Sequence, residues 1–498
     1  MIKNYPLFIN GEFKETSNKQ DIINPATGEI IAKVSLADNH EVEAAISGAR
    51  EAFDKGAWRS ITLEERKEVI LKISKGILDK AAELASLETL NNGKPLKEST
   101  FMDIPSSAKV FEYFANNLKE LLEAETISID SQIANAESRL IRQPRGVVAL
   151  IVPWNYPLLM ASWKLAQSLA AGNTVILKPS TLTPLTALEL GKIINEAGIP
   201  KGVVNIIAAR GQDVGAKLCS DSRVDMVSFT GSNQVGRKII EYTSENVKKV
   251  IMELGGKSAS LVFAESDIEA AVNGSLCSIF LNQGQMCTAM SRIFIEDKIY
   301  DRFISDFVNK AKRIKLGNGL DFETQMGPLI SESQRKKVAA FVEQAKKDGA
   351  KILCGGKIPE DSKLNKGFFF EPTVIANVNA DMAIFQEEIF GPVVCVGKFS
   401  SPEEAVSLAN NSNFGLAACI WSKDDQKTQG LAKKIDAGSV WINTYGMFFE
   451  ELPYGGFKQS GFGKELGKEG FFEYTRLKNI TADTTKGAKP LVNYWYGF

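Results

Sequence analysis

The sequence predicts an α/β protein with a doubly wound parallel sheet, a second α/β domain and a β-arm. From residue 146 onward, the strand-like runs GVVALIV, NTVILK, GVVNIIAA and DMVSFT are separated by helical segments such as TALELGKIINEAG. Short β-branched runs that alternate with helices of this length are typical of a parallel sheet. A second series, SASLVF, SRIFIED, TVIANV and PVVCVGKF, follows Gly255. We therefore expect two α/β domains that meet near Gly255–Gly256.

Two helices are predicted nearer the N-terminus. Thr62 and Glu65 form a capping-box pattern at the start of a long helix through KEVILKISKGILDKAAELASL. Asn39 is a candidate cap for an earlier helix, because apolar residues recur at helical spacing from Val42 to Phe53.

The β-arm is predicted from two segments that are far apart in the chain. The segment AETISIDSQIANAESRLIRQPRG, residues 124–146, alternates like a hairpin, and the C-terminal EYTRLKNITADTT is strand-like. Both segments could pair with another subunit.

Composition and charge narrow the classes of function. The chain has 498 residues, which favours two or three domains. Lys and Arg number 59 and Asp and Glu number 60, without a long run of one sign, so non-specific binding to nucleic acid or membranes is not supported. The apolar run GVVALIVPWNYPLLMASW is broken by Pro153, Asn155 and Pro157, and we read it as a buried strand, a turn and the start of a helix.

The six cysteines and the N-terminus indicate the compartment. No CxxC pair or secreted-domain spacing occurs, and MIKNYPLFINGEFK lacks the apolar region of a signal peptide. We expect a soluble, reduced, cytoplasmic protein, and no metal site is predicted.

One cysteine stands among small and polar residues rather than aliphatic ones. Cys287 lies in FLNQGQMCTAMSR, which suggests a thiol presented for reaction rather than packed in a core. Histidine is the usual base for a cysteine nucleophile, but the only histidine, His40, lies in the polar stretch ADNHEVE and reads as a solvated residue near a helix start.

Two polar residues in apolar surroundings are candidates for the rest of the chemistry. Glu253 follows the apolar Val250–Met252 and precedes two glycines, so we expect a desolvated carboxylate whose pKa is raised toward neutrality, as a general base requires. The structural alternative is a glutamate on a sheet edge. Asn155, in PWNYP, is either a turn-former or an amide that faces an oxyanion.

A nucleotide-binding turn is suggested where DMVSFT runs into GSNQVGRKIIEYTSE. A strand, a turn with Gly231 and Gly236, and then a helix is the arrangement that directs backbone N–H groups toward a phosphate. The pattern is not GxGxxG, and such glycines commonly just make turns. In ILKPST, Lys178 could reach a ribose or phosphate from the end of a strand; the alternative is a surface lysine.

Seven motifs carry a resemblance over almost the whole chain. PWNYP, ILKPS, FTGSNQVG, MELGGKS, GQMC, EEIFGPV and PYGGFKQSGFGKELG occur in the order and at the spacings of the aldehyde dehydrogenase superfamily, in its hydrolytic, non-phosphorylating form. The resemblance implies that Cys287 attacks an aldehyde and that the Asn155 amide and the Cys287 N–H stabilise the resulting oxyanion. It also implies that Glu253 activates the water that hydrolyses the thioester, with Lys164 and Glu465 as a proton-relay pair.

The same resemblance implies a nicotinamide cofactor. The residues expected to bind it are Trp154, Lys178, Ser180, Thr181, Gly231, Ser232, Glu388 and Phe390. Many NAD-preferring relatives have glutamate where this chain has Thr181, and a hydroxyl there does not repel a 2′-phosphate. The cofactor is therefore expected to be NAD or NADP.

The substrate side is expected to be an aromatic, uncharged funnel. By resemblance it is lined by Tyr156, Met160, Trp163, Met286, Thr288, Tyr445, Phe448 and Tyr454. Relatives that oxidise succinate semialdehyde have an arginine where Trp163 stands, so a distal carboxylate is disfavoured. Aromatic faces suit a quaternary ammonium aldehyde such as betaine aldehyde, or equally an apolar or aromatic aldehyde.

The resemblance also implies the domain boundaries and the assembly. A Rossmann-like NAD(P)-binding domain is expected over 1–123 and 145–254, a catalytic domain over 255–455, and an oligomerisation arm over 124–144 with 456–498. The arm of the family joins subunits, so a homo-oligomer, dimer or tetramer, is expected. Three alternatives are a CoA-acylating dehydrogenase, which generally lacks the glutamate base, a cysteine hydrolase without cofactor, and a non-catalytic structural protein.

Overall fold

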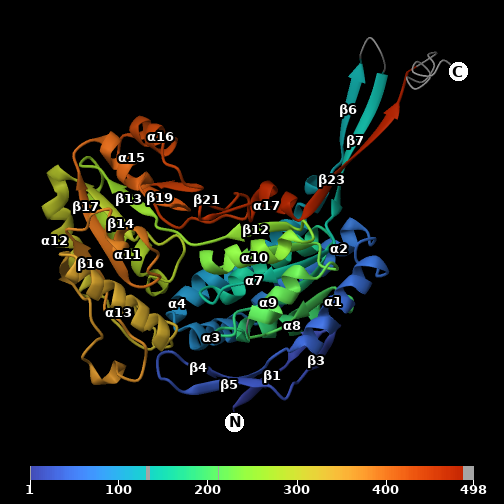
Figure 1. Ribbon diagram of the computed structural model, residues 1–498, viewed down its shortest axis with the longest axis horizontal. Coiled ribbons are helices and arrows are strands. Elements are labelled where there is room, and N and C mark those ends of the chain that lie inside the picture. Colours follow the sequence, from blue (N-terminus) through green and yellow to red (C-terminus); the bar gives the residue numbers. More distant parts are fainter. Residues whose placement is uncertain (1, 131–134, 211, 486–498) are drawn as a thin grey trace.

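Two lobes and a thin arm make up the protein (Figure 1). The structure is a computed structural model, and it describes residues 2–130, 135–210 and 212–485. Residues 131–134 and 486–498, which belong to the predicted arm, lie outside the described residues. The larger lobe holds most of the N-terminal half of the chain, and the smaller lobe holds α11 to α16, coloured yellow to orange.

The larger lobe is built on an eight-stranded sheet in the order β22-β12-β11-β8-β9-β10-β2-β3. Its strands are β2 (Leu7–Ile9), β3 (Glu12–Lys14), β8 (Val147–Ile151), β9 (Thr174–Lys178), β10 (Val204–Ile206), β11 (Met226–Thr230), β12 (Lys249–Glu253) and β22 (Gly461–Phe462). The five strands from β12 to β10 are parallel, and the predicted doubly wound sheet is confirmed. Strand order reverses at β8, since β9 and β10 lie on one side of it and β11 and β12 on the other. Such a reversal leaves a crevice at the carboxyl ends of the strands, where ligands bind in open α/β sheets.

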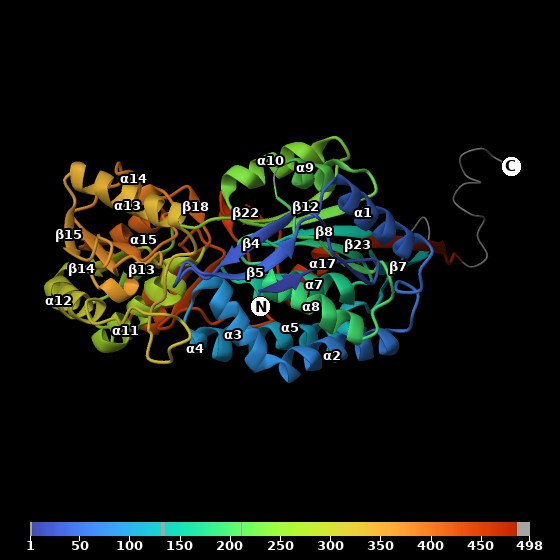
Figure 2. The ribbon, with the colours of Figure 1, turned by 90° about the horizontal axis from the view of Figure 1, so that it is seen from below.

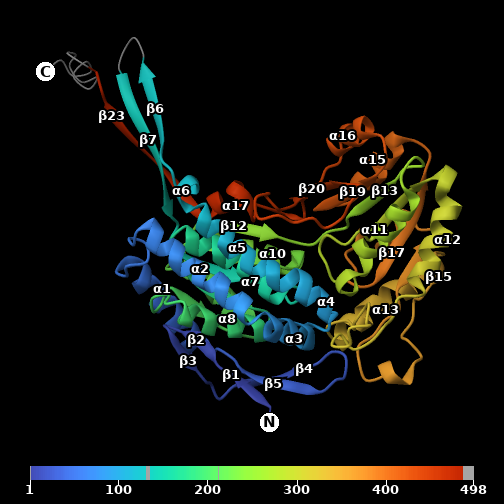
Figure 3. The same cartoon turned by 180° about the vertical axis from the view of Figure 1, so that it is seen from behind.

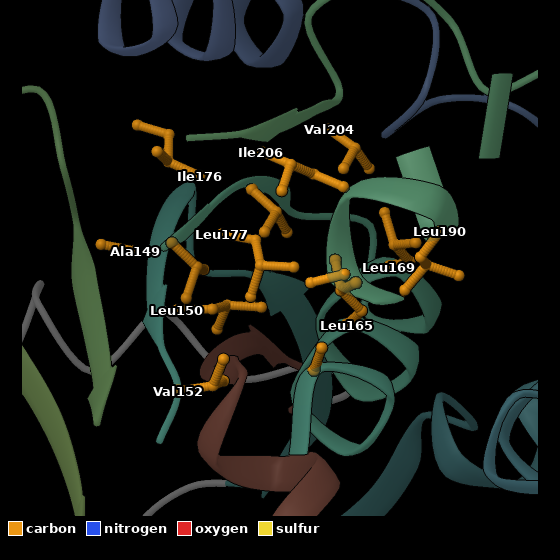
Figure 4. Close-up of a cluster of buried hydrophobic side chains, with 14 of the residues drawn as sticks. Ala149, Leu150, Val152, Leu165, Leu169, Ile176, Leu177, Leu190, Val204 and Ile206 are labelled. Carbon is orange, nitrogen blue, oxygen red and sulfur yellow. The ribbon is translucent and has the colours of Figure 1, made fainter. Parts of the chain in front are cut away.

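Helices cover both faces of this sheet (Figure 2). They are α1 (Asn39–Asp54), α9 (Gln212–Ser220) and α10 (Asn233–Ser244) on one face, and α2 (Leu63–Asp79), α3 (Ala81–Asn92), α5 (Ile104–Asn116), α7 (Pro157–Ala170) and α8 (Leu185–Glu196) on the other. Between the sheet and α7 and α8, the fully buried Leu150, Leu177 and Ile206 pack with Leu165 and Leu190 (Figure 4). This packed core fixes the positions of the carboxyl ends of the strands.

The smaller lobe has a seven-stranded sheet in the order β15-β16-β17-β14-β13-β19-β20. Its strands are β13 (Ala259–Val262), β14 (Arg292–Glu296), β15 (Lys351–Cys354), β16 (Thr373–Ala376), β17 (Val393–Phe399), β19 (Ala417–Trp421) and β20 (Ser439–Ile442). Its helices are α11 (Ile268–Phe280), α12 (Tyr300–Ala311), α13 (Glu332–Lys347), α14 (Ala383–Gln386), α15 (Pro402–Asn410) and α16 (Asp425–Ala432), with the short turns η2 (Leu281–Gly284), η3 (Asp297–Ile299) and η4 (Ser362–Leu364). The chain enters this lobe from β12 through Gly255 and Gly256, as the sequence indicated.

The remaining elements connect these bodies. They are β1 (Lys3–Tyr5), β4 (Lys19–Ile23) and β5 (Ile30–Ser35), which form a small sheet, β18 (Phe414–Gly415), which pairs with β21 (Phe457–Lys458), and the helical segments α4 (Leu96–Glu98), η1 (Ser99–Asp103), α6 (Leu118–Leu121) and α17 (Gly467–Glu473).

The arm is a three-stranded sheet of β6 (Glu125–Asp130), β7 (Asn135–Pro144) and β23 (Thr475–Asp483). The two predicted segments pair with each other within one chain, with Thr475 opposite Pro144 and Asp483 opposite Ala136. The sequence alone suggested pairing with another subunit, because a local pattern does not say which strand a distant segment meets. The sheet carries exposed apolar side chains, among them Ile129 and Leu477.

Three local expectations are resolved by the structure. The capping box at Thr62 and Glu65 is confirmed. The cap of α1 is Asp38 rather than Asn39, because the Asp38 carboxylate accepts from His40 N–H while the Glu41 side chain bonds back to the Asp38 backbone. The long helix predicted from Thr62 is broken at Lys80 into α2 and α3.

The apolar run that begins at Gly146 is also accounted for. It forms β8, a turn and the start of α7, as predicted. Within the described part of the chain, no helix has both the length and the apolar content needed to cross a bilayer.

Candidate active site

A cavity of about 380 Å³ opens between the lobes at the carboxyl ends of β8, β11 and β12. Most of the site residues predicted from the sequence line this cavity. They are Trp154, Asn155, Tyr156, Met160, Trp163, Lys164, Gly231, Ser232, Glu253, Met286, Cys287, Thr288, Glu388, Phe390, Phe448, Tyr454 and Glu465. Lys178, Ser180, Thr181 and Tyr445 do not line it. The convergence follows from the fold, since the ends of neighbouring parallel strands meet at one edge of the sheet.

Cys287 is presented by an unusual turn. The residues just before it, Asn282, Gln283 and Gly284, all have left-handed backbone conformations, with φ of 46°, 58° and 70°. At Gly284 a Cβ would lie 2.1 Å from the Gly391 carbonyl oxygen, so only glycine fits. The turn places the half-buried Cys287 thiol on the cavity wall.

The thiol of Cys287 is neutral at rest. Burial raises its pKa to about 12, and the nearby Glu388 and Glu253 carboxylates act in the same direction. The Tyr454 hydroxyl, 3.2 Å from the Cys287 Sγ, opposes them by hydrogen bonding to the thiolate. Because the thiolate is the nucleophile, this site needs a base to remove the proton.

Glu253 is positioned as such a base. It ends β12, is almost fully buried, and neither of its carboxylate oxygens has a hydrogen-bond partner among the described residues. Burial raises its pKa well above the usual range, the charge of Glu465 raises it further, and Lys164 acts in the opposite direction. The expectation of a desolvated carboxylate with a raised pKa is met, and the alternative of an exposed sheet-edge glutamate is not.

Lys164 and Glu465 form a buried ion pair behind Glu253. Lys164 Nζ lies 2.5 Å from Glu465 Oε1 and donates to Ser228 Oγ at 2.7 Å. The Tyr474 hydroxyl is 3.0 Å from each oxygen of the same carboxylate. Sequence reasoning missed Ser228 and Tyr474, because neither stands in a recognisable pattern.

Asn155 has one amide hydrogen directed across the lobe boundary. Its Nδ2 donates to the carbonyl oxygen of Gln285 at 2.9 Å, two residues before the nucleophile. An amide nitrogen carries two hydrogens, so one remains for a ligand in the cavity. The side chain is 5% exposed, which makes its orientation well defined.

The side of the cavity toward α10 has the features of a dinucleotide site. Ser232 caps α10, and Gly231 and Ser232 both line the cavity, so the N-terminus of this helix lies beside it; the Gly231 N–H itself donates to the Glu253 carbonyl oxygen. The rings of Trp154 and Phe390 meet edge to face at 5.1 Å, and Phe390 has the left-handed φ of 59°. A strained aromatic residue beside a ligand cavity commonly marks a functional position.

Glu388 and Lys178 extend this side of the site. The Glu388 carboxylate accepts from the Gly256 N–H at 3.0 Å, and burial raises its pKa to about 7. Lys178 ends β9, and burial lowers the pKa of its amine. Its position at the carboxyl end of the sheet agrees with a residue that reaches toward a ribose rather than one on an open surface.

The opposite side of the cavity is aromatic, as expected. The Trp163 ring lies 5.4 Å from that of Tyr454 and 6.1 Å from that of Phe448. Tyr156 presents only one face, because Lys94 Nζ lies 3.8 Å from its ring centre. Three rings and part of a fourth therefore surround the substrate side.

Two expectations about this side are corrected. Tyr445 lies behind the wall, with its hydroxyl 3.3 Å from Thr288 Oγ1 and 3.6 Å from Met286 Sδ, because its loop folds under those residues. The lining of the funnel also includes two acidic residues, Asp103 and Glu450, each of them paired with a lysine. Both come from segments that sequence motifs did not connect to the site, and only the fold brings them there.

Comparisons with known proteins agree on one family. The model of the aldehyde dehydrogenase family matches residues 13–480. The chain is 48% identical over 492 residues to a betaine aldehyde dehydrogenase of Bacillus subtilis, covering 98% of this chain and 99% of the relative. It is 41% identical to the chloroplastic betaine aldehyde dehydrogenase of Beta vulgaris, covering 96% of each. A solved betaine aldehyde dehydrogenase of Staphylococcus aureus in complex with NAD+ has a TM-score of 0.94 at 43% identity, over 99% of this chain and 96% of that one.

The contact between Tyr454 and Cys287 can be tested without a substrate. Tyr454→Phe removes the hydroxyl that stabilises the thiolate, so the pKa of Cys287 should rise further. Each pKa unit lowers the thiolate fraction about tenfold at a fixed pH below the pKa, so alkylation of Cys287 by iodoacetamide should slow about three- to tenfold. Tyr445→Phe is the matched control, because its hydroxyl contacts Thr288 instead. Equal alkylation rates in the wild type and Tyr454→Phe would contradict the assignment.

Proposed function

The chain belongs to the aldehyde dehydrogenase family, and from that membership we propose that it oxidises betaine aldehyde to the carboxylate with NAD+ or NADP+. The observation that carries the proposal is the cavity itself. It brings the Cys287 thiol, the Asn155 amide and the unpartnered Glu253 carboxylate together beneath a cluster of aromatic rings. The similarity to betaine aldehyde dehydrogenases of bacteria and a plant supports the choice of substrate.

The proposed chemistry begins at Cys287. Its thiol loses a proton as the sulfur attacks the aldehyde carbon, and the ionised form of Glu253, which lines the same cavity, would accept that proton. The Asn155 amide and the Cys287 backbone N–H would hold the oxyanion of the thiohemiacetal. Glu253 would then remove a proton from the water that hydrolyses the Cys287 thioester, and Lys164 and Glu465 would carry that proton onward.

The residues beside α10 fit the nicotinamide cofactor. Gly231 and Ser232 would hold the pyrophosphate. Lys178, with Ser180 and Thr181 nearby, would hold the adenosine ribose. Trp154 would contact the pyrophosphate side as well, and Glu388 and Phe390 would hold the nicotinamide end against Cys287. The bound cofactor supplies the hydride acceptor that converts an aldehyde to the oxidation level of an acid.

The wall of the cavity supports a cationic substrate. The faces of Trp163, Phe448 and Tyr454 attract an alkylammonium group, and each such contact is worth about 0.5–2 kcal/mol when desolvated. The carboxylates of Asp103 and Glu450 add negative charge to the same side, although Lys94 and Lys109 lie 2.6 and 2.9 Å from them. A trimethylammonium aldehyde suits this wall better than one with a distal carboxylate.

The assembly and the compartment are part of the proposal. Exposed apolar residues on the arm sheet support association of the arm with another subunit, into a dimer or tetramer. The six cysteines are free, which supports a reducing compartment such as the cytoplasm.

The choice of a cationic aldehyde is tested with a neutral isostere. Betaine aldehyde and 3,3-dimethylbutanal differ only in a quaternary nitrogen against a quaternary carbon, so the difference isolates the charge. We expect kcat/KM for betaine aldehyde, measured by formation of reduced cofactor, to be at least about tenfold higher, since about 1.4 kcal/mol corresponds to a factor of ten. Cys287→Ser should lose the activity by orders of magnitude while still binding cofactor. Equal rates for the two aldehydes would reject the cationic substrate class, and an active Cys287→Ser would reject the nucleophile.

The role of Glu253 separates the two halves of the reaction. In Glu253→Gln we expect steady-state turnover about 10²–10⁴-fold below the wild type, since hydrolysis lacks its base, and a first-turnover burst of reduced cofactor remains only if Cys287 has another route to the thiolate. In the wild type, turnover should fall as the pH falls through the raised pKa of Glu253, because the base becomes protonated. Rapid-mixing kinetics over a pH series measures both. Unimpaired steady-state turnover in the variant would make Glu253 structural.

Thr181 tests the cofactor assignment. Thr181→Glu should disfavour NADP relative to NAD, because a carboxylate about 5 Å from a 2′-phosphate repels it by about 3 kcal/mol at an effective dielectric constant near 20. The measurement is the ratio of kcat/KM for the two cofactors at fixed ionic strength. Thr186→Glu is unsuitable as a control because Thr186 is buried, whereas Thr16→Glu, at a half-buried position that does not line the cavity, should leave the ratio unchanged. An unchanged ratio in Thr181→Glu would mean that residue 181 does not face the ribose.

A further inference from the structure

A chain of buried polar residues follows the end of α3 along the cavity. Glu88, Asn92 and Lys94 are fully buried and Glu98 is 6% exposed, although charged side chains are seldom buried without a purpose. Figure 3 shows α3 and α4 where the two lobes meet, and Leu96 donates its N–H to the Gly319 carbonyl oxygen of the smaller lobe at 2.8 Å. The proposed chemistry uses none of these residues. We call the segment that holds them, residues 88–98, the bracket.

The bracket contacts the nucleophile turn at its first left-handed residue. Glu98 Oε2 accepts from the Asn282 backbone N–H at 3.0 Å. Asn282 and Gln283 are non-glycine residues with positive φ, and each such residue costs about 1–3 kcal/mol unless its surroundings hold it. The turn therefore depends on contacts from outside itself, and Glu98 supplies one from the other lobe.

The same bracket contacts the opposite wall of the site. Asn92 Nδ2 donates to the carbonyl oxygen of Trp154 at 3.0 Å and to that of Asn155 at 3.4 Å. Asn282 Nδ2 donates to the same Asn155 carbonyl oxygen at 2.9 Å. The bracket thus holds the turn that carries Asn155 and the turn that leads to Cys287, which come from different lobes.

Lys94 provides the charge balance within the bracket. It lies 2.6 Å from Asp103, and burial raises the pKa of Glu98 to about 8, an effect that the Lys94 ammonium opposes. The hydrogen bond from the Asn282 backbone N–H is the direct contact of Glu98 with the site.

We propose that Glu98 is a positioning residue that fixes the Cys287 thiol relative to the Asn155 amide through its hydrogen bond to Asn282. The proposal rests on the proposed function, because it concerns the geometry of thiol attack. The effect depends on the length of the Glu98 side chain and on its acceptor oxygen, and it does not depend on the charge of Glu98. A displacement of about 1 Å between reacting groups can cost about a hundredfold in rate.

A pair of conservative variants separates reach from charge. Glu98→Asp keeps the charge and withdraws the acceptor by one methylene, whereas Glu98→Gln keeps the reach and an acceptor oxygen and removes the charge. We expect the burst rate constant with betaine aldehyde to fall about 10- to 100-fold in Glu98→Asp and to stay within about threefold in Glu98→Gln, with the Kd for NAD+ within about twofold in both. Glu41→Gln is the matched control, since Glu41 is a buried carboxylate that caps α1 on the far face of the large sheet.

Three outcomes overturn the proposal. If Glu98→Asp keeps the burst rate of the wild type, the hydrogen bond has no positioning role. If Glu98→Gln falls as far as Glu98→Asp, an acceptor oxygen at the reach of glutamate is not sufficient, and the statement that charge has no part is wrong. If both variants lose rate and cofactor affinity together with the fraction of folded protein, the role is only structural.

A second readout keeps the test independent of the substrate. The rate of Cys287 alkylation by iodoacetamide should change more than about fivefold in Glu98→Asp and stay within about twofold in Glu98→Gln, because the accessibility of the thiol follows the turn. A wild type that forms no reduced cofactor with betaine aldehyde, alongside variants that show the expected alkylation pattern, would reject the proposed substrate and retain the role of Glu98.

Discussion

Burial of an unpartnered carboxylate at the end of β12 is the constraint on which the rest of the site depends. A charged group without hydrogen bonds is unfavourable in a protein interior, so Glu253 favours its protonated form and its pKa rises. Burial raises the pKa of the Cys287 thiol as well. Burial therefore disfavours ionisation of both groups, and only the ionised form of Glu253 can accept the proton that Cys287 loses as the sulfur attacks a bound aldehyde. Behind Glu253, the charge of Glu465 raises its pKa and the charge of Lys164 lowers it, and neither residue forms a hydrogen bond with the Glu253 carboxylate.

The lobes divide the chemistry between them. The larger lobe supplies Asn155 and Glu253 from strand ends, where the position of a side chain is set by the packed sheet and its helices. The smaller lobe supplies Cys287 from a turn with three left-handed residues, which has little regular structure to hold it. The contacts that cross the boundary, from Asn155 to Gln285 and from Glu98 to Asn282, are therefore the ones that align the reacting groups. Rigid strand ends set the base and the amide, and hydrogen bonds across the boundary set the nucleophile.

The substrate side combines aromatic faces with acidic side chains. The rings of Trp163, Phe448 and Tyr454 form one contiguous cluster, and Glu450 lies in the same wall. Aromatic rings alone would accept a neutral alkyl group as readily as an alkylammonium group, because burial of apolar area rewards both.

The sequence by itself determined the elements and the reactive groups. Strand and helix periodicity predicted the parallel sheet and the capping box at Thr62 was correct, because period and caps are properties of adjacent residues. Local polarity made Cys287 and Glu253 candidates, and the structure places both on one cavity. The tertiary structure alone decided which segments meet. It paired β23 with β7, broke the long helix at Lys80, put Tyr445 behind the wall, and brought Asp103, Glu450 and Tyr474 to the site. These placements depend on contacts between residues hundreds of positions apart, and a local pattern does not encode the energy of such packing.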